Sequence, residues 1–270
     1  MGLRMRANFL GCPIDILTMQ ETVALAREAM QSRKRLHHVA INVAKLVNMR
    51  RDPVLAADVI GSDVVGIDGM GIVLGARSLG IPVTERVAGI DLFLELLALC
   101  AERGYRPFFL GGTSDVLQRA KNEVLKQYPN LRFAGSRDGY FTTEQEEDVV
   151  NKIRDSGADC LFIGMPTPRK ERFLACHKRT LAVPFIMGVG GSFDVLAGHV
   201  HRAPAFLRAV GFEWLYRVYQ EPRRMWWRYA RTNTLFAVIM LRALISHAVT
   251  GLKQLRNSSS QEGPEHKRNI

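Results

Sequence analysis

The stretch Asp63-Val-Val-Gly-Ile-Asp68, followed directly by Gly69-Met-Gly71, decides the fold class of this chain. A short apolar run that ends in a carboxylate and a glycine-rich turn is typical of a buried strand that leads into a helix. A helical pattern then continues to about residue 79. If this strand–turn–helix unit repeats along the chain, the sequence predicts a parallel sheet.

The unit does repeat. Short apolar runs predict further strands at residues 37–42, 107–110, 131–134, 159–163 and 184–189. Helices are predicted at about 69–79, 89–103, 114–127, 143–155 and 168–178, and another follows the capping-box sequence Thr18-Met-Gln-Glu21. Short apolar strands that alternate with helices predict an α/β fold: a Rossmann-like parallel sheet with helices on both faces.

Polar residues and glycines gather where the predicted strands end. Ligands in open α/β sheets bind beyond the carboxyl ends of the strands, so we expect a site there. The residues at these ends are Asn42, Asp68, Gly111, Gly112, Gly164, Gly190 and Gly191. A simpler structural explanation stays open, namely that each pair of glycines only turns the chain.

Asp68 is the candidate for chemistry at this edge. A carboxylate held at a strand end can act as a general base on a hydroxyl group. The structural alternative is that Asp68 caps the next helix by accepting hydrogen bonds from its free N–H groups. The spacing alone does not decide between these two roles.

The overall charge indicates an anionic partner. The 270-residue chain is 47% hydrophobic, which is enough for one sizeable core, and its formal net charge is +11. The N-terminus has no long apolar segment, so we expect no signal peptide. The four cysteines are far apart and form no C-x-x-C pair, which predicts a reducing compartment and no metal site. Two of them, Cys100 and Cys160, lie in apolar runs and are expected in the core.

The composition changes near residue 200. Residues 201–231 contain seven arginines and two glutamates, interleaved with Trp and Tyr, and the apolar run Leu235-Phe-Ala-Val-Ile-Met-Leu241 follows. We therefore predict a Rossmann-like domain at 1–200, a helical membrane-association appendage at 201–256 and a disordered tail at 257–270. The apolar run is short and no 18-residue stretch lacks charge, so the appendage is expected to lie in the membrane interface without crossing it.

Two other functions need weighing. Gly69-Met-Gly71 with Gly75, and Asp91 sixteen residues later, loosely matches a dinucleotide fingerprint, which would indicate a nicotinamide-dependent oxidoreductase. The spacing is wrong, and the preceding strand is not the first of the sheet. The region rich in Arg and aromatic residues would also suit a nucleic-acid-binding protein. The apolar run directly after it favours a membrane surface instead, so we expect no nucleic acid partner.

Several stretches, taken together and in order, resemble the WecG/TagA/CpsF family, glycosyltransferase family 26. They run from about residue 37 to 231. The stretches are Ile67-Asp68-Gly69-Met70-Gly71, Glu85-Arg86-Val87-Ala88-Gly89-Ile90-Asp91, Phe109-Leu110-Gly111-Gly112, Gly139-Tyr140-Phe141, Gly164-Met-Pro-Thr-Pro168-Arg-Lys-Glu171, Gly188-Val-Gly-Gly191 with Phe193-Asp194, Arg202-Ala-Pro204, Glu213-Trp214-Leu-Tyr-Arg217 and Glu221-Pro222-Arg223.

The resemblance implies an inverting, metal-independent glycosyltransferase in bacterial surface or exopolysaccharide biosynthesis. The donor would be a UDP-sugar, often UDP-N-acetylmannosamine, and the acceptor a polyprenyl-diphosphate-linked sugar. The enzyme would be attached peripherally to the cytoplasmic face of the plasma membrane. No cofactor and no metal are expected, and the chain has no D-x-D pair. The resemblance leaves a homo-oligomer open.

The resemblance also assigns roles to residues. The catalytic base falls on Asp68, the substrate-contacting arginine on Arg86 and the strand-end asparagine on Asn42. Without a metal, cations and helix N-termini must stabilise the departing diphosphate. The expected substrate-binding residues are Asn42, Gly69, Arg86, Gly111, Gly112, Gly164, Pro168, Lys170, Glu171, Gly190, Gly191, Arg202, Arg217, Arg223 and Arg224.

Two residues depart from the family's pattern. Ala40 stands where many members have Thr, and Lys170 where many have Gln. Both positions are expected near the sugar site, so UDP-N-acetylmannosamine is not secure as the donor. A UDP-hexose such as UDP-glucose is an alternative.

Overall fold

A computed structural model describes residues 4–204, 206–207 and 211–261 of the chain. Within them, the main sheet has six parallel strands in the order β4-β3-β8-β7-β5-β6. These strands are β3 (Leu36–Ile41), β4 (Val64–Ile67), β5 (Pro107–Gly111), β6 (Gly135–Arg137), β7 (Cys160–Gly164) and β8 (Phe185–Gly188). The predicted α/β fold with a parallel sheet is therefore confirmed.

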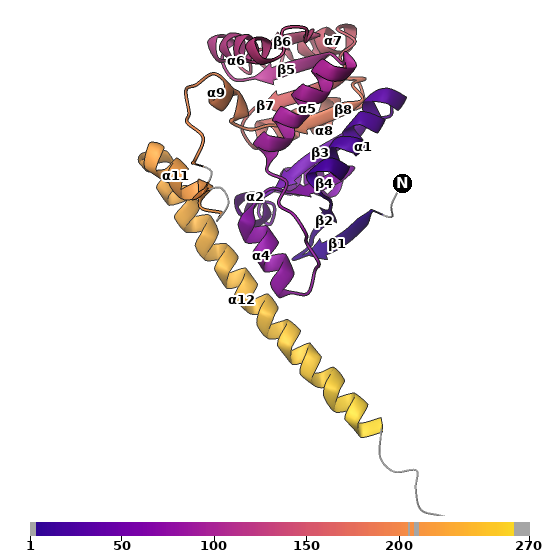
Figure 1. The fold of residues 1–270 in the computed structure, drawn as a ribbon. Coiled ribbons are helices and arrows are strands. Elements are labelled where there is room, and N and C mark those ends of the chain that lie inside the picture. Colours follow the sequence, from indigo (N-terminus) through magenta and orange to yellow (C-terminus); the bar gives the residue numbers. More distant parts are fainter. Residues whose placement is uncertain (1–3, 205, 208–210, 262–270) are drawn as a thin grey trace, which may run out of the picture.

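Helices cover both faces of this sheet (Figure 1). On one face, α1 (Met19–Ser32), α5 (Gly89–Arg103) and α6 (Ser114–Gln127) bury their apolar sides against residues such as Phe109, Phe162 and Met187. On the other face lie α2 (Val43–Asn48), α3 (Pro53–Ile60), α4 (Met70–Ser78), α7 (Glu146–Asp155) and α8 (Arg169–His177). A short helix, α9 (Ser192–Leu196), follows β8. Successive strand residues enter opposite cores because side chains alternate between the faces of a strand.

Local signals in the sequence account for several of these boundaries. Thr18 and Glu21 form the predicted capping box at the start of α1, with each side chain bonded to the other residue's backbone N–H. Cys100 and Cys160 are fully buried, with their sulfur atoms 3.5 Å apart, which confirms their expected place in the core.

The strand predicted at 131–134 is displaced. The pairing begins at Gly135, which lies opposite Phe108 of β5. A Cβ atom at Gly135 would lie 2.7 Å from the ring of Phe108, so only glycine lets the backbone approach this strand. Leu131 is buried in the core but precedes the strand.

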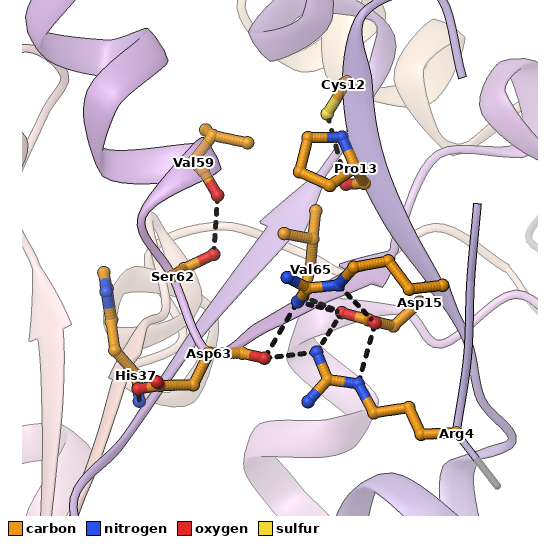
Figure 2. A network of polar contacts seen from close by, with 10 residues as sticks. Arg4, Cys12, Pro13, Asp15, His37, Val59, Ser62, Asp63 and Val65 are labelled. Carbon is orange, nitrogen blue, oxygen red and sulfur yellow. Dashed lines mark hydrogen bonds and ion pairs between the residues drawn. The ribbon is translucent and has the colours of Figure 1, made fainter. Parts of the chain in front are cut away.

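An N-terminal hairpin was missed from the sequence. It consists of β1 (Met5–Phe9) and β2 (Cys12–Ile16), which pair antiparallel. Asp15 is 1% exposed and joins the hairpin to the sheet, because it accepts hydrogen bonds from the side chains of Arg4 and Arg6 and from the backbone N–H of Val65. Both arginines also donate to the carbonyl of Asp63 (Figure 2).

Asp15→Asn should lower the free energy of unfolding by about 2–3 kcal/mol, because it removes the charge that both arginines share. Burial alone would raise the pKa of Asp15, but the hydrogen bonds from Arg6, Arg4 and Val65 outweigh it and lower the pKa. The contribution is therefore present at neutral pH and is lost as the pH falls through this depressed pKa. Urea titrations at pH 7 and at pH 3 measure it: the difference between wild type and variant should shrink at pH 3, and an unchanged midpoint at pH 7 would contradict the assignment.

The C-terminal part consists of two helices, α11 (Glu213–Gln220) and α12 (Pro222–Gln261). Figure 1 shows α12 passing along α2 and continuing well beyond the body of the protein. Phe236 and Met240 hold it there, since both pack in the core cluster that includes Phe9 and Leu46. The predicted appendage boundary at residue 256 falls inside α12, and residues 262–270 of the predicted tail lie outside the described part of the chain.

The length of the apolar segment in the appendage was underestimated from the sequence. Its apolar run was expected to be too short to span a membrane, but it belongs to one continuous helix. The segment Met225–Val249 is long and apolar enough to cross a bilayer by length and composition. A search for apolar runs underestimates such a segment, because isolated charges interrupt the run without interrupting the helix.

Candidate functional site

All strands of the main sheet are parallel, so their carboxyl ends meet at one edge of the sheet. This edge brings together residues from separate parts of the chain. Asn42 follows β3, Asp68 and Gly69 follow β4, Gly111 and Gly164 end β5 and β7, and Gly190 and Gly191 come just after β8. The expectation that these residues lie along one edge is confirmed by the topology.

Asp68 is held at this edge by one of its two carboxylate oxygens. Oδ1 accepts a hydrogen bond of 3.0 Å from the backbone N–H of Gly89, at the start of α5. Gly69 caps α4 without a side-chain hydrogen bond, so Asp68 does not cap the helix that directly follows it. Among the described residues no group donates to Oδ2. One oxygen therefore fixes the carboxylate, and the other is left to accept a proton.

The loop before α5 lies next to Asp68. The backbone N–H of Val87 donates to the carbonyl of Ile67, at the end of β4, over 2.9 Å. Together with the bond from Gly89 to Asp68, this ties both sides of the loop to the strand end. Arg86 precedes Val87 directly, so its backbone is placed beside the candidate base.

Arg86 is mostly buried but keeps hydrogen-bonding capacity. Its Nη2 lies 3.7 Å from Oε2 of Glu213, with the two side chains 15% and 23% exposed. That separation makes an ion pair but is too long for a hydrogen bond. No hydrogen bond from its guanidinium group is found within the described residues. The five N–H donors of Arg86 can therefore serve a ligand.

Asn42 lies at the carboxyl edge of the sheet and also caps a helix. Its side-chain oxygen accepts from the backbone N–H of Lys45 over 3.0 Å and so caps α2. The amide NH₂ group is not used by this cap. Gly69 packs against it, since a Cβ atom there would lie 3.2 Å from Cα and Cβ of Asn42. The two strand ends are therefore in direct contact.

The glycines that end β5 and β7 are required by close packing. Gly111 has φ +117°, and a Cβ atom there would lie 2.5 Å from the carbonyl of Gly164. A Cβ atom at Gly164 would lie 2.5 Å from the ring of Phe193. The N–H of Gly112 donates to the carbonyl of Gly164 over 3.2 Å. These contacts explain the glycines without a ligand, whereas Gly190, with φ +55°, faces open space.

Lys170 and Glu171 are buried, at 5% and 0% exposure. The ammonium group of Lys170 lies 2.8 Å from Oε1 of Glu171 and 3.7 Å from Oδ2 of Asp58, a residue of α3. Thr167 also donates to Glu171 over 3.2 Å. Because these charges already have partners inside the protein, their expected direct contact with substrate stays a prediction.

This buried cluster contains groups that the sequence reading missed. His37 lies 3.8 Å from Asp58, and burial lowers its pKa to about 3, with Lys170 acting in the same direction. Burial also raises the pKa of Asp58 and lowers that of Lys45 to about 8. The missed signal was Asp58 itself, which lies three residues after Leu55 and beside Val59 on the buried side of α3.

The four arginines of the appendage that were expected to bind substrate differ in their surroundings. Arg202 pairs with Asp91 of α5, so its charge is engaged within the protein. Arg223 is exposed at the start of α12. Arg217 and Arg224 lie in α11 and α12, but their side chains are outside the described part of the structure. Of these four arginines, Arg202 is therefore the one whose pairing with the main α/β part of the protein is described.

A surface cavity of about 540 Å³ lies away from Asp68. It is lined by residues around the start of α7 and α8, and Pro168 is one of the expected substrate-binding residues. Arg169 stacks on the ring of Phe141 at 4.6 Å and donates to the carbonyl of the same residue. None of the residues at the strand ends lines this cavity, so the candidate site is the strand-end edge near Asp68.

The loose dinucleotide pattern has a structural explanation. A Cβ atom at Gly71 would lie 2.6 Å from Val43, and one at Gly75 would lie 2.9 Å from the ring of Phe9 and 3.0 Å from Met240. These glycines therefore let α4 pack against its neighbours. Within the described residues, no group of three His, Cys, Asp or Glu side chains is placed to hold a metal ion.

Comparison with known protein families gives a match over most of the chain. The model of a family described as the glycosyl transferase WecG/TagA/CpsF family matches residues 7–249. The match covers most of the hairpin, the whole main sheet, and α11 with most of α12. It thus includes both the strand-end site and the segment of α12 that is long enough to span a membrane.

Proposed function

This chain belongs to the WecG/TagA/CpsF family of glycosyltransferases, and from that premise we propose that it moves a sugar from a UDP-sugar to a polyprenyl-diphosphate-linked acceptor. Membership makes it a glycosyltransferase of cell-surface polysaccharide biosynthesis, with a nucleotide-sugar donor and a lipid-linked acceptor. The proposal adds four points to this. The nucleotide is UDP, the transfer inverts the anomeric configuration, no metal is needed, and the acceptor's lipid anchor is a polyprenyl diphosphate.

The observation that carries the proposal is the half-engaged carboxylate of Asp68. With Oδ1 held by Gly89, Oδ2 can accept the proton of an acceptor hydroxyl. The hydroxyl oxygen forms a bond to the anomeric carbon as the bond from that carbon to the UDP oxygen breaks. The electron pair leaves with UDP, and the configuration at the anomeric carbon inverts.

The leaving UDP needs positive charge close to the strand ends. Arg86 supplies it in the proposal, because its guanidinium group has free donors and its backbone adjoins the segment that holds Asp68. A planar guanidinium can form two parallel hydrogen bonds to a phosphate. The exposed arginine of α12, Arg223, and the two whose side chains are not described, Arg217 and Arg224, are proposed to help from the appendage.

Arg86→Ala should lower kcat/KM by about ten- to a hundredfold, because it removes charge-assisted hydrogen bonds to the diphosphate. Steady-state rates with the donor varied measure this effect. Thermal melting must show a folded variant. A variant that folds normally and turns over at the wild-type rate would make Arg86 a structural residue only.

The donor sugar is proposed to be N-acetylmannosamine or a hexose such as glucose. Ala40 leaves more room than the threonine common in the family, and its Cβ lies near Gly89 and thus near Asp68. A panel of UDP-sugars with a short-chain lipid-diphosphate-sugar acceptor tests the whole proposal, each reaction run with and without EDTA. Transfer should occur for one sugar and survive the chelator. Transfer from none of them, or only from a sugar on another nucleotide, would refute the proposed donor.

The enzyme is proposed to attach peripherally to the inner face of the plasma membrane through α12. Trp226 and Trp227 are exposed, as are Leu241 and Ile245 on the part that leaves the body. Such aromatic residues suit the boundary between lipid and water. Phe236 and Met240, near the middle of the span-length segment, pack on the catalytic body. A spanning α12 would pull that body into the bilayer, which supports attachment in the plane of the interface.

A further inference from the structure

The appendage makes an acidic contact with the proposed donor-binding residue. Glu213 begins α11, and its carboxylate lies 3.7 Å from the guanidinium group of Arg86. These residues are more than a hundred positions apart in the chain, so the pair exists only because α11 lies over the loop before α5. An acidic residue in the first turn also suits the helix dipole, which would explain Glu213 without any link to Arg86.

Two further contacts join the appendage to the α/β part of the protein near Arg86. A Cβ atom at Gly211 would lie 2.7 Å from the side chain of Met70, so the chain entering α11 packs tightly on the start of α4, two residues from Asp68. Arg202 pairs with Asp91 in the first turn of α5. Besides Arg86 itself, the appendage therefore contacts the start of α4 and the first turn of α5.

A long arginine side chain needs such support to be preorganised for a ligand. Free arginine side chains lose rotamer entropy when they bind, and a partner that holds the guanidinium in place removes part of that cost in advance. At 3.7 Å, Glu213 restrains Arg86 electrostatically without using its N–H donors. A tight bidentate pair would compete with the diphosphate, whereas this loose pair leaves the donors free.

We propose that Glu213 is a positioning residue for the donor site, which acts by holding Arg86 in the orientation that binds the diphosphate of the nucleotide. The inference rests on the proposed function, because it takes UDP as the donor's nucleotide and Arg86 as its ligand. It adds the positioning of Arg86 to the diphosphate contacts already proposed for the arginines of the appendage.

Calorimetric titration of the full-length protein with UDP and with uridine tests this role. Glu213→Gln should weaken UDP binding about three- to tenfold, as expected for two interacting neighbours, and leave uridine binding unchanged. Glu213→Asp should recover part of the loss. In an Arg86→Ala background, Glu213→Gln should have no further effect, because the residue through which it acts is gone.

Gln220→Ala is the matched control. Gln220 also lies in α11, and its side chain exchanges two hydrogen bonds with the backbone of His201, so its loss loosens the same helix without touching Arg86. This variant should bind UDP as the wild type does. Equal losses for Gln220→Ala and Glu213→Gln would overturn the inference in favour of a general effect of α11.

The remaining outcomes separate this inference from the proposed function. If the wild type binds UDP and Glu213→Gln binds it equally well or more tightly, Glu213 does not position Arg86 and the inference fails alone. An additive loss in the Arg86→Ala background would also overturn it. If the wild type binds no UDP at all, the proposed donor fails and the inference fails with it.

Discussion

Asp68→Asn should lower the turnover number by about 10²–10⁴-fold, the usual cost of losing a general base. Asparagine keeps a side-chain oxygen in the place of Oδ1, so the hydrogen bond from Gly89 and the loop before α5 are preserved. The amide that replaces Oδ2 cannot take the proton of the acceptor hydroxyl. The loss should therefore fall on kcat, with UDP affinity largely unchanged.

Single-turnover rates and UDP titration on the same preparation measure this split. Asp63→Asn is the matched control, since Asp63 precedes the same strand at its opposite end and accepts a hydrogen bond from the backbone of His37. It should leave turnover close to that of the wild type. Wild-type turnover in Asp68→Asn would remove Asp68 from the mechanism.

The second prediction with a large expected effect concerns membrane binding by the part of α12 that extends beyond the body of the protein. Leu241→Ser/Ile245→Ser should lower partitioning onto anionic vesicles by about a hundredfold, because each residue loses the transfer energy of a large apolar side chain. The two residues are 60% and 55% exposed, so they make few contacts within the protein. The fold and the activity on a soluble acceptor analogue should therefore be unaffected.

Ile60→Ser is the control, a single substitution of the same kind outside α12. Ile60 ends α3 and is also 55% exposed, so it controls for the general effect of removing a surface isoleucine. Flotation of each variant with anionic vesicles at low salt measures partitioning. Unchanged flotation of the α12 variant, or an equal loss for Ile60→Ser, would contradict membrane attachment through this helix. Point substitutions are preferable to removal of α12, because Phe236 and Met240 belong to the core.

The sequence alone determined the α/β architecture and which residues lie at the edge of the sheet where the site is proposed. Buried parallel strands need continuous apolar runs, and the glycines and polar residues that follow each run are read locally. Asp63–Asp68 thus predicted both β4 and the position of Asp68 at its carboxyl end. The resemblance of several short stretches predicted the family correctly.

Local patterns did not reveal the hairpin or the length of α12. In β2, Asp15 interrupts the apolar alternation because it is buried with two arginines, a pairing that no local pattern specifies. In α12, three arginines interrupt the apolar segment Met225–Val249, namely Arg228, Arg231 and Arg242. The helix continues through them, because it depends on backbone hydrogen bonds that charged side chains do not break.

Only the tertiary structure decided which charges of the site are free. Lys170 and Arg202 were expected to bind substrate as Arg86 was, but Lys170 is buried beside Glu171 and Asp58, and Arg202 is paired with Asp91. Arg86 has a looser partner, Glu213. Ion pairs join residues that are distant in the chain, so they follow from how helices are placed against one another. Hydrophobic periodicity is local and specifies which face of an element is buried, but not which charge will meet it.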